Sequence, residues 1–291
     1  RVMQGRTPVR GVLHPNVNAW YGHGLYALWF VPVALAAAYY FLPKILGKPV
    51  SNYYLASLGF WWLAVTSAFA GGSRLIGAPV PVWIPTLGIV ANMLVVVGVV
   101  VVALNLFGTL SGRYAAARAS LTLRFILVSL VGFALAAVMN LALSMRSFAA
   151  IVQFTLLDGL RDWLTFYACF STAMFGAVYF MLPRLTGREW RFTGLIKLHF
   201  GTTVLGVVLM TVGLAAAGWT QGQLLNDAAV PFADITKALS FWFAFRTVVL
   251  GVLLLGHLAF LINFVGMACP FNSHGNAPAT FRTPPELGLV K

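Results

Sequence analysis

Residues 82–107 read VWIPTLGIVANMLVVVGVVVVALNLF, a run that contains no charged side chain. A helix needs about 20 consecutive apolar residues to cross the hydrocarbon core of a bilayer. Only helices and closed barrels satisfy their backbone hydrogen bonds in lipid, and a barrel strand would show shorter, alternating segments. This long continuous run therefore predicts a transmembrane α-helix.

Similar apolar runs recur along the chain, separated by segments rich in Gly, Pro and charge such as PKILGKPVSN and TLSGRYAAARAS. Composition agrees, because 60% of the residues are hydrophobic and only 9% are charged. Three charged residues, Asp158, Arg161 and Asp162, fall in the first turns of the fifth run. The fold class predicted is an all-α polytopic transmembrane bundle of about seven spans, at residues 19–43, 53–76, 83–108, 121–144, 154–183, 192–219 and 236–267.

The chain divides by composition into three parts. We expect an outer-side polar tail at 1–18, a transmembrane bundle at 19–267 and a cytoplasmic tail at 268–291. The first part holds no apolar core of a signal peptide, and the chain starts at Arg1. We therefore expect a processed chain, a fragment or a protein with upstream spans.

The net charge of +13 would suggest nucleic-acid binding in a soluble protein. Here the basic residues fall in short loops between apolar runs, so we expect lipids and not nucleic acid as the partner. Cytoplasmic loops carry the excess of Lys and Arg, which predicts a cytoplasmic C-terminus and an N-terminus outside. The richer side holds Lys44, Lys48, Arg113, Arg118, Arg184, Arg188, Arg191, Lys197, Arg282 and Lys291, and the other side Arg1, Arg6, Arg10, Arg74, Arg146 and Lys237.

Ionisable groups inside spans are candidates for function. We expect His23 near the outer end of the first span, His199 near the inner end of the sixth and His257 in the middle of the seventh, on different helices at different depths. Haem or copper ligation would need histidines at matched depths on facing helices, so hydrogen bonding between helices is the expected role. Arg246, in the seventh span, could reach a propionate or a lipid phosphate, or pair with Asp234 or a carbonyl.

Four stretches carry a resemblance to a known family. HPNVNAWYGHGLYALWFVPVALAAAYYFLPKILGKPV (14–50) resembles the sixth helix of the catalytic subunit, subunit I, of cbb3-type haem-copper oxidases. FWWLAVTSAFAGGSRLIGAPVPVWIPTLG (60–88), FGAVYFMLPRLTGREW (175–190) and AGWTQG (217–222) resemble later segments in the same order. The resemblance covers nearly the whole chain and corresponds to the second half of that subunit, in a bacterial inner membrane.

The departures from the family pattern concern its metal and haem ligands. His23 stands where the resemblance places a copper ligand. The family's adjacent histidine pair falls on Ser73 and Arg74, and its active-site tyrosine falls on Ser67. Its H-x-H pair, which ligates both haems, falls near Arg161 and Trp163 in an ungapped alignment.

One histidine cannot hold copper, because affinity needs several ligands. We therefore expect His23 to be a vestigial copper-ligand position and this chain to bind neither haem nor copper. No catalytic residue is predicted. The former pocket is either kept for packing or adapted for quinone, lipid or proton passage.

The function implied by the resemblance is a non-catalytic subunit that anchors or scaffolds a respiratory electron-transfer complex. Its expected partners are other membrane subunits, such as membrane-bound cytochromes c that carry haem c. We expect the chain not to be catalytic by itself and its complex to be an oxidoreductase. One alternative is that the chain forms part of an active haem-copper oxidase or nitric oxide reductase-like enzyme with ligands from another chain. Another alternative is that it is a transporter or channel subunit.

Overall fold

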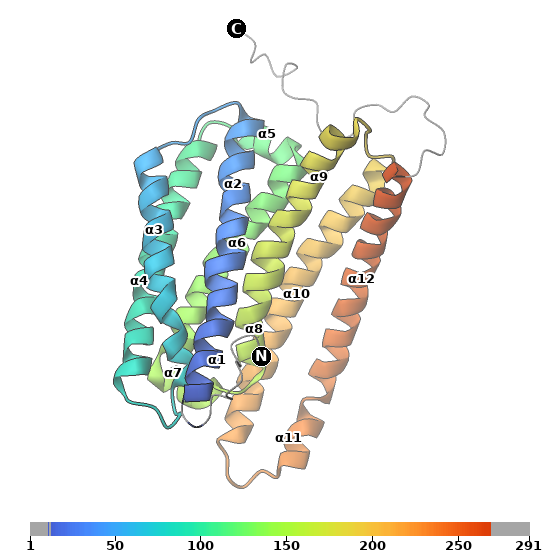
Figure 1. Ribbon diagram of the computed structural model, residues 1–291. Coiled ribbons are helices and arrows are strands. Elements are labelled where there is room, and N and C mark those ends of the chain that lie inside the picture. The colour runs from blue at the N-terminus through green and yellow to red at the C-terminus, as the bar shows by residue number, and fades with distance from the viewer. Residues whose placement is uncertain (1–10, 12, 269–291) are drawn as a thin grey trace, which may run out of the picture.

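The computed structural model describes residue 11 and residues 13–268, and the expected tails at 1–18 and 268–291 lie mostly outside this part. Within it, seven helical stretches are long and apolar enough to cross a membrane. They cover Leu13–Leu46, Tyr53–Leu75, Trp83–Leu110, Leu121–Ser144, Leu156–Thr186, Thr193–Leu225 and Ser240–Met267. The prediction of an all-α bundle of seven spans is confirmed, and the long helices stand side by side in Figure 1.

Three of the spans are built from several elements. The first comprises α1 (Leu13–Gly24), the π-helical segment η1 (Leu25–Phe30) and α2 (Val31–Leu46). The second comprises α3 (Tyr53–Ala70) and the 3₁₀ turn η2 (Gly71–Leu75). The fifth comprises α8 (Leu156–Trp163), the π-helical segment η3 (Leu164–Ser171) and α9 (Thr172–Thr186).

The other four spans are single α-helices: α4 (Trp83–Leu110), α6 (Leu121–Ser144), α10 (Thr193–Leu225) and α12 (Ser240–Ala268). Short helices lie in the connections: α5 (Tyr114–Ala119), α7 (Arg146–Val152) and α11 (Phe232–Ala238). In Figure 1 the end of the bundle with α5 lies opposite the end with α7 and α11. The loops therefore gather in two layers, as a membrane protein requires.

Local sequence signals fix several helix ends. The side chain of Asn52 accepts a hydrogen bond from the Leu55 amide at 3.1 Å, and Ser120 caps α6 in the same way through Leu123. Gly47 and Gly187 end α2 and α9 in the left-handed conformation, which glycine adopts without a steric penalty. Both glycines follow a proline and a basic residue in the last helical turn.

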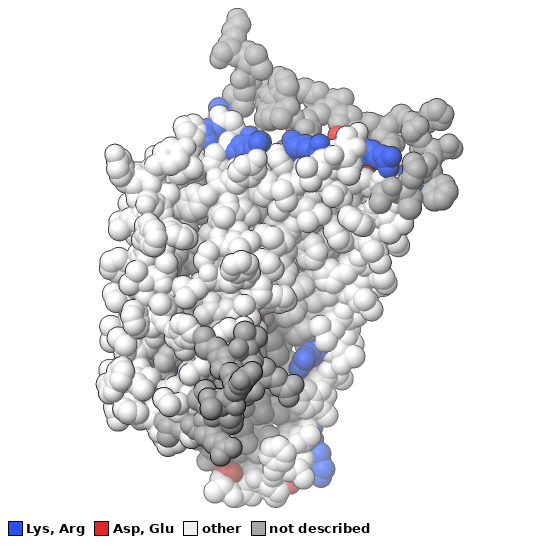
Figure 2. Space-filling model, in the orientation of Figure 1, with Lys and Arg blue, Asp and Glu red and all other residues white. Residues whose placement is uncertain are grey.

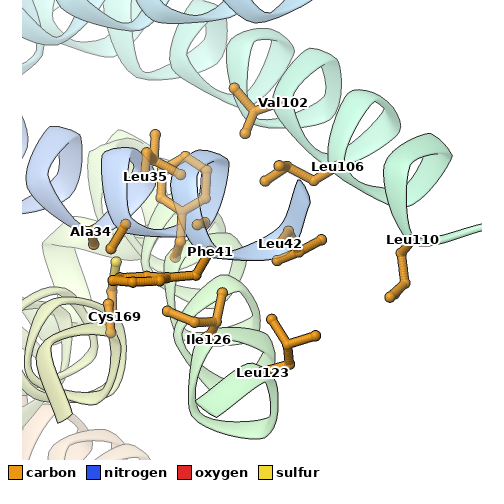
Figure 3. Packing of buried hydrophobic residues seen from close by; sticks show 14 of the residues in the cluster. Ala34, Leu35, Phe41, Leu42, Val102, Leu106, Leu110, Leu123, Ile126 and Cys169 are labelled. Atoms are coloured by element: carbon orange, nitrogen blue, oxygen red, sulfur yellow. The ribbon is translucent and has the colours of Figure 1, made fainter. Parts of the chain in front are cut away.

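The largest apolar core joins α2, α4, α6 and the fifth span. Figure 3 shows Phe41 and Leu42 of α2 beside Leu123 and Ile126 of α6, with Leu106 of α4 on the other side. Cys169 of η3 is buried in this cluster, whereas Cys269 lies outside the described residues. This core thus packs the first, third, fourth and fifth spans against one another.

Candidate functional site

His23 lies at the end of α1, directly before η1, and packs against η2. A side chain at Gly71 of η2 would place its Cβ 2.9 Å from the Cβ of His23, so the close approach requires glycine. The imidazole is buried, with 7% of its residue surface exposed. Its Nε2 atom has no hydrogen-bond partner among the described residues.

A cavity of about 130 Å³ lies beside His23, inside the bundle. Most of its wall is apolar, with Leu35, Leu63, Val95 and Phe133 contributed by four spans. The wall residues with polar side-chain groups are His23, Tyr26, Ser67, Arg74, Asn92, Asn140 and Thr165. Ser67 and Arg74, where the resemblance predicts a tyrosine and a histidine, thus lie around one small space.

Ion pairs hold Arg74, at the edge of this cavity, in place. Arg74 Nη2 of η2 lies 2.8 Å from Asp162 Oδ1 of α8. Arg161 Nη2 lies 2.9 Å from Asp158 Oδ1, and its Nε is 3.9 Å from Asp162 Oδ1. Two arginines therefore face two aspartates, so the cluster as a whole carries no net charge.

A second cavity, of about 300 Å³, adjoins this ion-pair cluster. Its wall includes Ser73, Gln153 and all four charged residues of the cluster. Arg74 belongs to the walls of both cavities. The arginine therefore lies between this more polar space and the mostly apolar space beside His23.

The fifth span reaches the cavity at the start of its π-helical segment η3. Thr165, the second residue of η3, lines the wall, and its hydroxyl donates to the Arg161 carbonyl at 3.0 Å. Trp163 is absent from the wall and stacks on Tyr167 with ring centroids 4.4 Å apart. A π-helical turn holds one residue more than an α-helical turn, so the facing residue shifts along the sequence.

The structure brings some predicted residues together and separates others. His23, Ser67 and Arg74 share the first cavity, whereas Ser73 and Arg161 face the second. Arg246 is exposed on α12, away from both cavities. Asp234, a partner considered for Arg246, instead accepts from Lys237 at 3.1 Å.

Asparagines within the apolar runs are site residues that sequence reasoning missed. Asn92 donates to the hydroxyl of Ser73 at 3.0 Å and to the carbonyl of Ala70 at 3.1 Å, which fixes η2 against α4. Asn140 of α6 lines the cavity beside His23. The sequence did offer a signal for them. A lone side-chain amide inside a long apolar run needs a hydrogen-bond partner in lipid, which predicts a contact with another helix.

The prediction that His199 and His257 lie at different depths is wrong. Their ring centroids are 5.5 Å apart, so α10 and α12 bring them to one level. Tyr179 bonds to His199 Nδ1 at 2.8 Å, and Tyr167 bonds to His257 Nε2 at 3.0 Å. Distances counted from span ends misled the prediction, because the spans differ in length and in where their helices begin.

Metal-ligating side chains are sparse around these sites. No group of three or more His, Cys, Asp or Glu side chains lies close enough to share a metal ion in residues 11 and 13–268. Arg74 shares the cavity wall with His23, and an arginine, which stays protonated in proteins, offers a metal no lone pair.

Comparison with known proteins agrees with the fold and the motifs. A protein named as a cbb3-type cytochrome c oxidase subunit, from Stutzerimonas stutzeri, is 28% identical over 227 residues, 75% of this chain and 47% of the relative. A cytochrome c oxidase subunit 1 homolog from Azorhizobium caulinodans is 29% identical over 221 residues, 74% of this chain and 39% of the relative. The chain therefore spans less than half the length of these relatives.

A solved structure of a heme-copper terminal oxidase dimer matches the fold with a TM-score of 0.75 at 15% identity. The match covers 93% of this chain and 51% of that chain. The family model described as cytochrome c and quinol oxidase polypeptide I matches residues 2–252. With most of its length matched, this multi-pass membrane protein belongs to the cytochrome c and quinol oxidase polypeptide I family.

Proposed function

We propose that this chain is a non-catalytic, subunit I-like membrane subunit that anchors or scaffolds a respiratory electron-transfer complex. One observation carries the proposal: Arg74, at a histidine position of the family, is fixed beside His23 by its ion pair with Asp162. An arginine cannot act as a metal ligand, because it stays protonated in proteins. The family's metal chemistry therefore has no ligand at this position.

The space available also supports the proposal. Pockets for drug-sized ligands measure roughly 300–1,000 Å³, and a haem is larger than most such ligands. The cavity beside His23 measures about 130 Å³. Trp163, near the expected position of the H-x-H pair, lies stacked on Tyr167 outside this cavity. The small cavity and the position of Trp163 support a site without haem.

A scaffolding subunit needs surfaces for its partners, and Arg246 marks one on α12. Its side chain is exposed about six residues into the helix, a rise of roughly 9 Å. Exposed neighbours on the same helix are apolar, including Phe243 and Val248. A charge at this depth is costly without an anion, so we assign Arg246 to a carboxylate of a partner helix or a lipid phosphate.

The partners that fit are membrane subunits of a respiratory complex, such as membrane-bound cytochromes c, which would carry haem c. The basic side chains support an orientation for this assembly. Figure 2 shows Lys and Arg along the end of the bundle where α2, α5 and α9 meet the loops. Positive residues favour the cytoplasmic side, so we place this end inside a bacterial cytoplasmic membrane and the opposite end outside.

Spectroscopy and metal analysis test the proposal. The purified chain alone should show no haem absorbance band, whereas the intact complex should show haem from its other subunits. Copper and iron are measured in the same samples, with His23→Ala as the matched variant. A haem spectrum of the isolated chain would refute the proposal.

The alternative is that the chain forms part of an active oxidase or nitric oxide reductase-like enzyme that takes metal ligands from another chain. The observation that favours it is the buried Nε2 of His23, which has no partner among the described residues. This alternative predicts about one copper or non-haem iron per chain in the intact complex. Loss of that metal in His23→Ala, with the complex still assembled, would decide for it.

A further inference from the structure

An apolar groove of about 270 Å³ lies between α4 and α6. Leu42 of α2 and Val102 and Leu106 of α4 are buried wall residues, and Figure 3 shows these three side chains near one another. Phe107 and Val131 also line the groove, with 61% and 59% of their surfaces exposed. The groove therefore has a buried floor and an exposed rim, and it opens on the lipid-facing surface of the bundle.

The groove begins at the basic end of the bundle and extends through about one leaflet of a membrane. Its wall on α4 runs from Val99 to Leu110, the last residue of the helix, which corresponds to roughly 16 Å along the helix axis. The hydrocarbon core of a bilayer is roughly 30 Å thick. A transmembrane helix of a partner would need a groove that spans this whole thickness, whereas a lipid acyl chain extends through one leaflet. The length of the groove therefore favours an acyl chain.

Three arginines lie next to the end of this groove at the membrane surface. Arg113 follows α4, and its amide donates to the carbonyl of the wall residue Leu110 at 3.0 Å. Arg124 lies about one turn before Leu127, a wall residue of α6. The Nε atom of Arg124 donates to the carbonyl of Arg118, in the last turn of α5, at 2.5 Å. The two walls and the short helix between them thus each bring an arginine to one end of the groove.

Apolar contacts hold α5 at this end of the groove. The rings of Tyr114 of α5 and Phe107 of the groove rim have centroids 6.0 Å apart. Ala117 of α5 is buried in the same apolar core as the wall residue Leu110. Arg118, the residue after Ala117, is exposed. The short helix therefore buries one side against the end of the groove and leaves Arg118 at the surface beside it.

The positive charge of these arginines lacks a carboxylate partner in the described part of the chain. Among residues 11 and 13–268, the ion pairs involve Arg74, Arg161 and Lys237, which belong to the opposite end of the bundle. Neighbouring positive charges repel one another, so an anion among them is favoured. Arginine binds phosphate through paired hydrogen bonds, and the cytoplasmic leaflet is rich in anionic lipid. A lipid phosphate is therefore the complementary group.

We infer that the groove between α4 and α6 is a binding site for one anionic phospholipid. An acyl chain fills the apolar groove, and the phosphate accepts hydrogen bonds from the guanidinium groups of Arg113, Arg118 and Arg124. Such a site is more specific than the general attraction of basic loops to an anionic membrane, because it requires both the arginines and the groove. The bound lipid joins α4, α5 and α6 at the basic end of the bundle.

Titration of phosphatidylglycerol into the delipidated full chain in detergent tests the inference, with native mass spectrometry as the readout. We expect one tightly bound molecule per chain and at least roughly fivefold weaker binding of phosphatidylcholine with the same acyl chains. Arg113→Gln and Arg118→Gln should each weaken phosphatidylglycerol binding roughly fivefold and phosphatidylcholine binding less. Lys197→Gln removes a positive charge from α10, on the other side of the bundle from α4 in Figure 1. This matched control should bind as tightly as the unchanged chain.

A groove-filling variant tests the acyl chain separately from the phosphate. Ala103 of α4 lines the groove and is exposed, so Ala103→Phe adds apolar volume there and leaves the three arginines in place. Phosphatidylglycerol should bind roughly tenfold more weakly to this variant, since the lost burial of about two methylene groups corresponds to that factor. Ala244→Phe, at an exposed position of α12, is the matched control and should leave binding unchanged.

Equal binding of the two lipids would overturn the inference, as would unchanged binding of phosphatidylglycerol by both arginine variants or by Ala103→Phe. The same measurement on the intact complex separates a lipid from a protein occupant. The complex should retain the phospholipid in the unchanged protein and lose it more readily in Arg118→Gln. A complex without this lipid would assign the groove to a segment of a partner subunit and would also overturn the inference.

Discussion

Arg74 Nη2 lies 2.8 Å from Asp162 Oδ1, and this contact joins the end of the second span to the start of the fifth. The two side chains are partly buried, with 20% and 36% of their surfaces exposed. The same arginine lies between the cavity beside His23 and the more polar cavity. The ion pair therefore contributes to stability and fixes the shape of the candidate site.

Asp162→Asn should destabilise the chain by about 1–2 kcal/mol, because the substitution leaves a partly buried arginine without its counter-charge. Asp234→Asn is the matched control, since the Lys237–Asp234 pair is exposed and such pairs contribute about 0–1 kcal/mol. Thermal unfolding of the purified protein in detergent measures both. Equal effects of the two variants would mean that the Arg74–Asp162 pair has no special role.

Gly132→Ala should destabilise the bundle by about 1–3 kcal/mol through overpacking. A Cβ at Gly132 of α6 would lie 2.6 Å from the backbone carbonyl of Ala168 in η3, so the helices must move apart. Gly201→Ala of α10 is the control, because a Cβ there meets nothing within 4 Å. A thermal shift as large for Gly201→Ala as for Gly132→Ala would contradict this explanation.

Tyr179→Phe should destabilise the bundle by about 1–3 kcal/mol, because it leaves His199 Nδ1 buried and unpaired. Tyr179 and His199 are both 0% exposed, so water cannot replace the lost hydroxyl without rearrangement. Tyr54→Phe removes a hydroxyl from a side chain that is 90% exposed and should leave the unfolding temperature unchanged. Similar unfolding temperatures for the two variants would mean that the Tyr179–His199 hydrogen bond does not stabilise the fold.

The sequence predicted the spans closely, because long apolar runs leave few alternatives in lipid. The fourth span was placed at 121–144, as α6 has it, whereas the first helix begins at Leu13 and not at 19. The polar side chains of His14, Asn16 and Asn18 hid this first turn, because a helix outside the hydrocarbon needs no continuous apolar run. The connecting helices α5, α7 and α11 were missed for the same reason.

The site was less predictable than the spans, because it depends on the register of facing helices. The π-helical segments η1 and η3 have no distinctive sequence pattern, yet the fifth span reaches the cavity with Thr165 of η3 and not with Trp163. The ion pair of Arg74 with Asp162 joins residues 88 positions apart, which single-sequence reasoning could not pair. Resemblance to the family located His23, Ser67 and Arg74, and the structure then placed them around one cavity.

Cysteine labelling tests the orientation proposed for the bundle. Cys169 is buried, so a Cys269→Ser background should react little with a membrane-impermeant maleimide. In that background, Ser111→Cys lies after α4 on the basic end, and Asp227→Cys lies after α10 on the opposite end. Both positions are exposed.

Because Lys and Arg favour the cytoplasmic side, Ser111→Cys should react in inverted vesicles and not in intact spheroplasts. Asp227→Cys should show the reverse pattern, and detergent-solubilised protein should react at both positions, which controls for reactivity. The reverse pattern at both sites would place the basic end outside. The surface of α12 that carries Arg246 would then belong to the cytoplasmic half of the membrane, and its partner would have to be sought there.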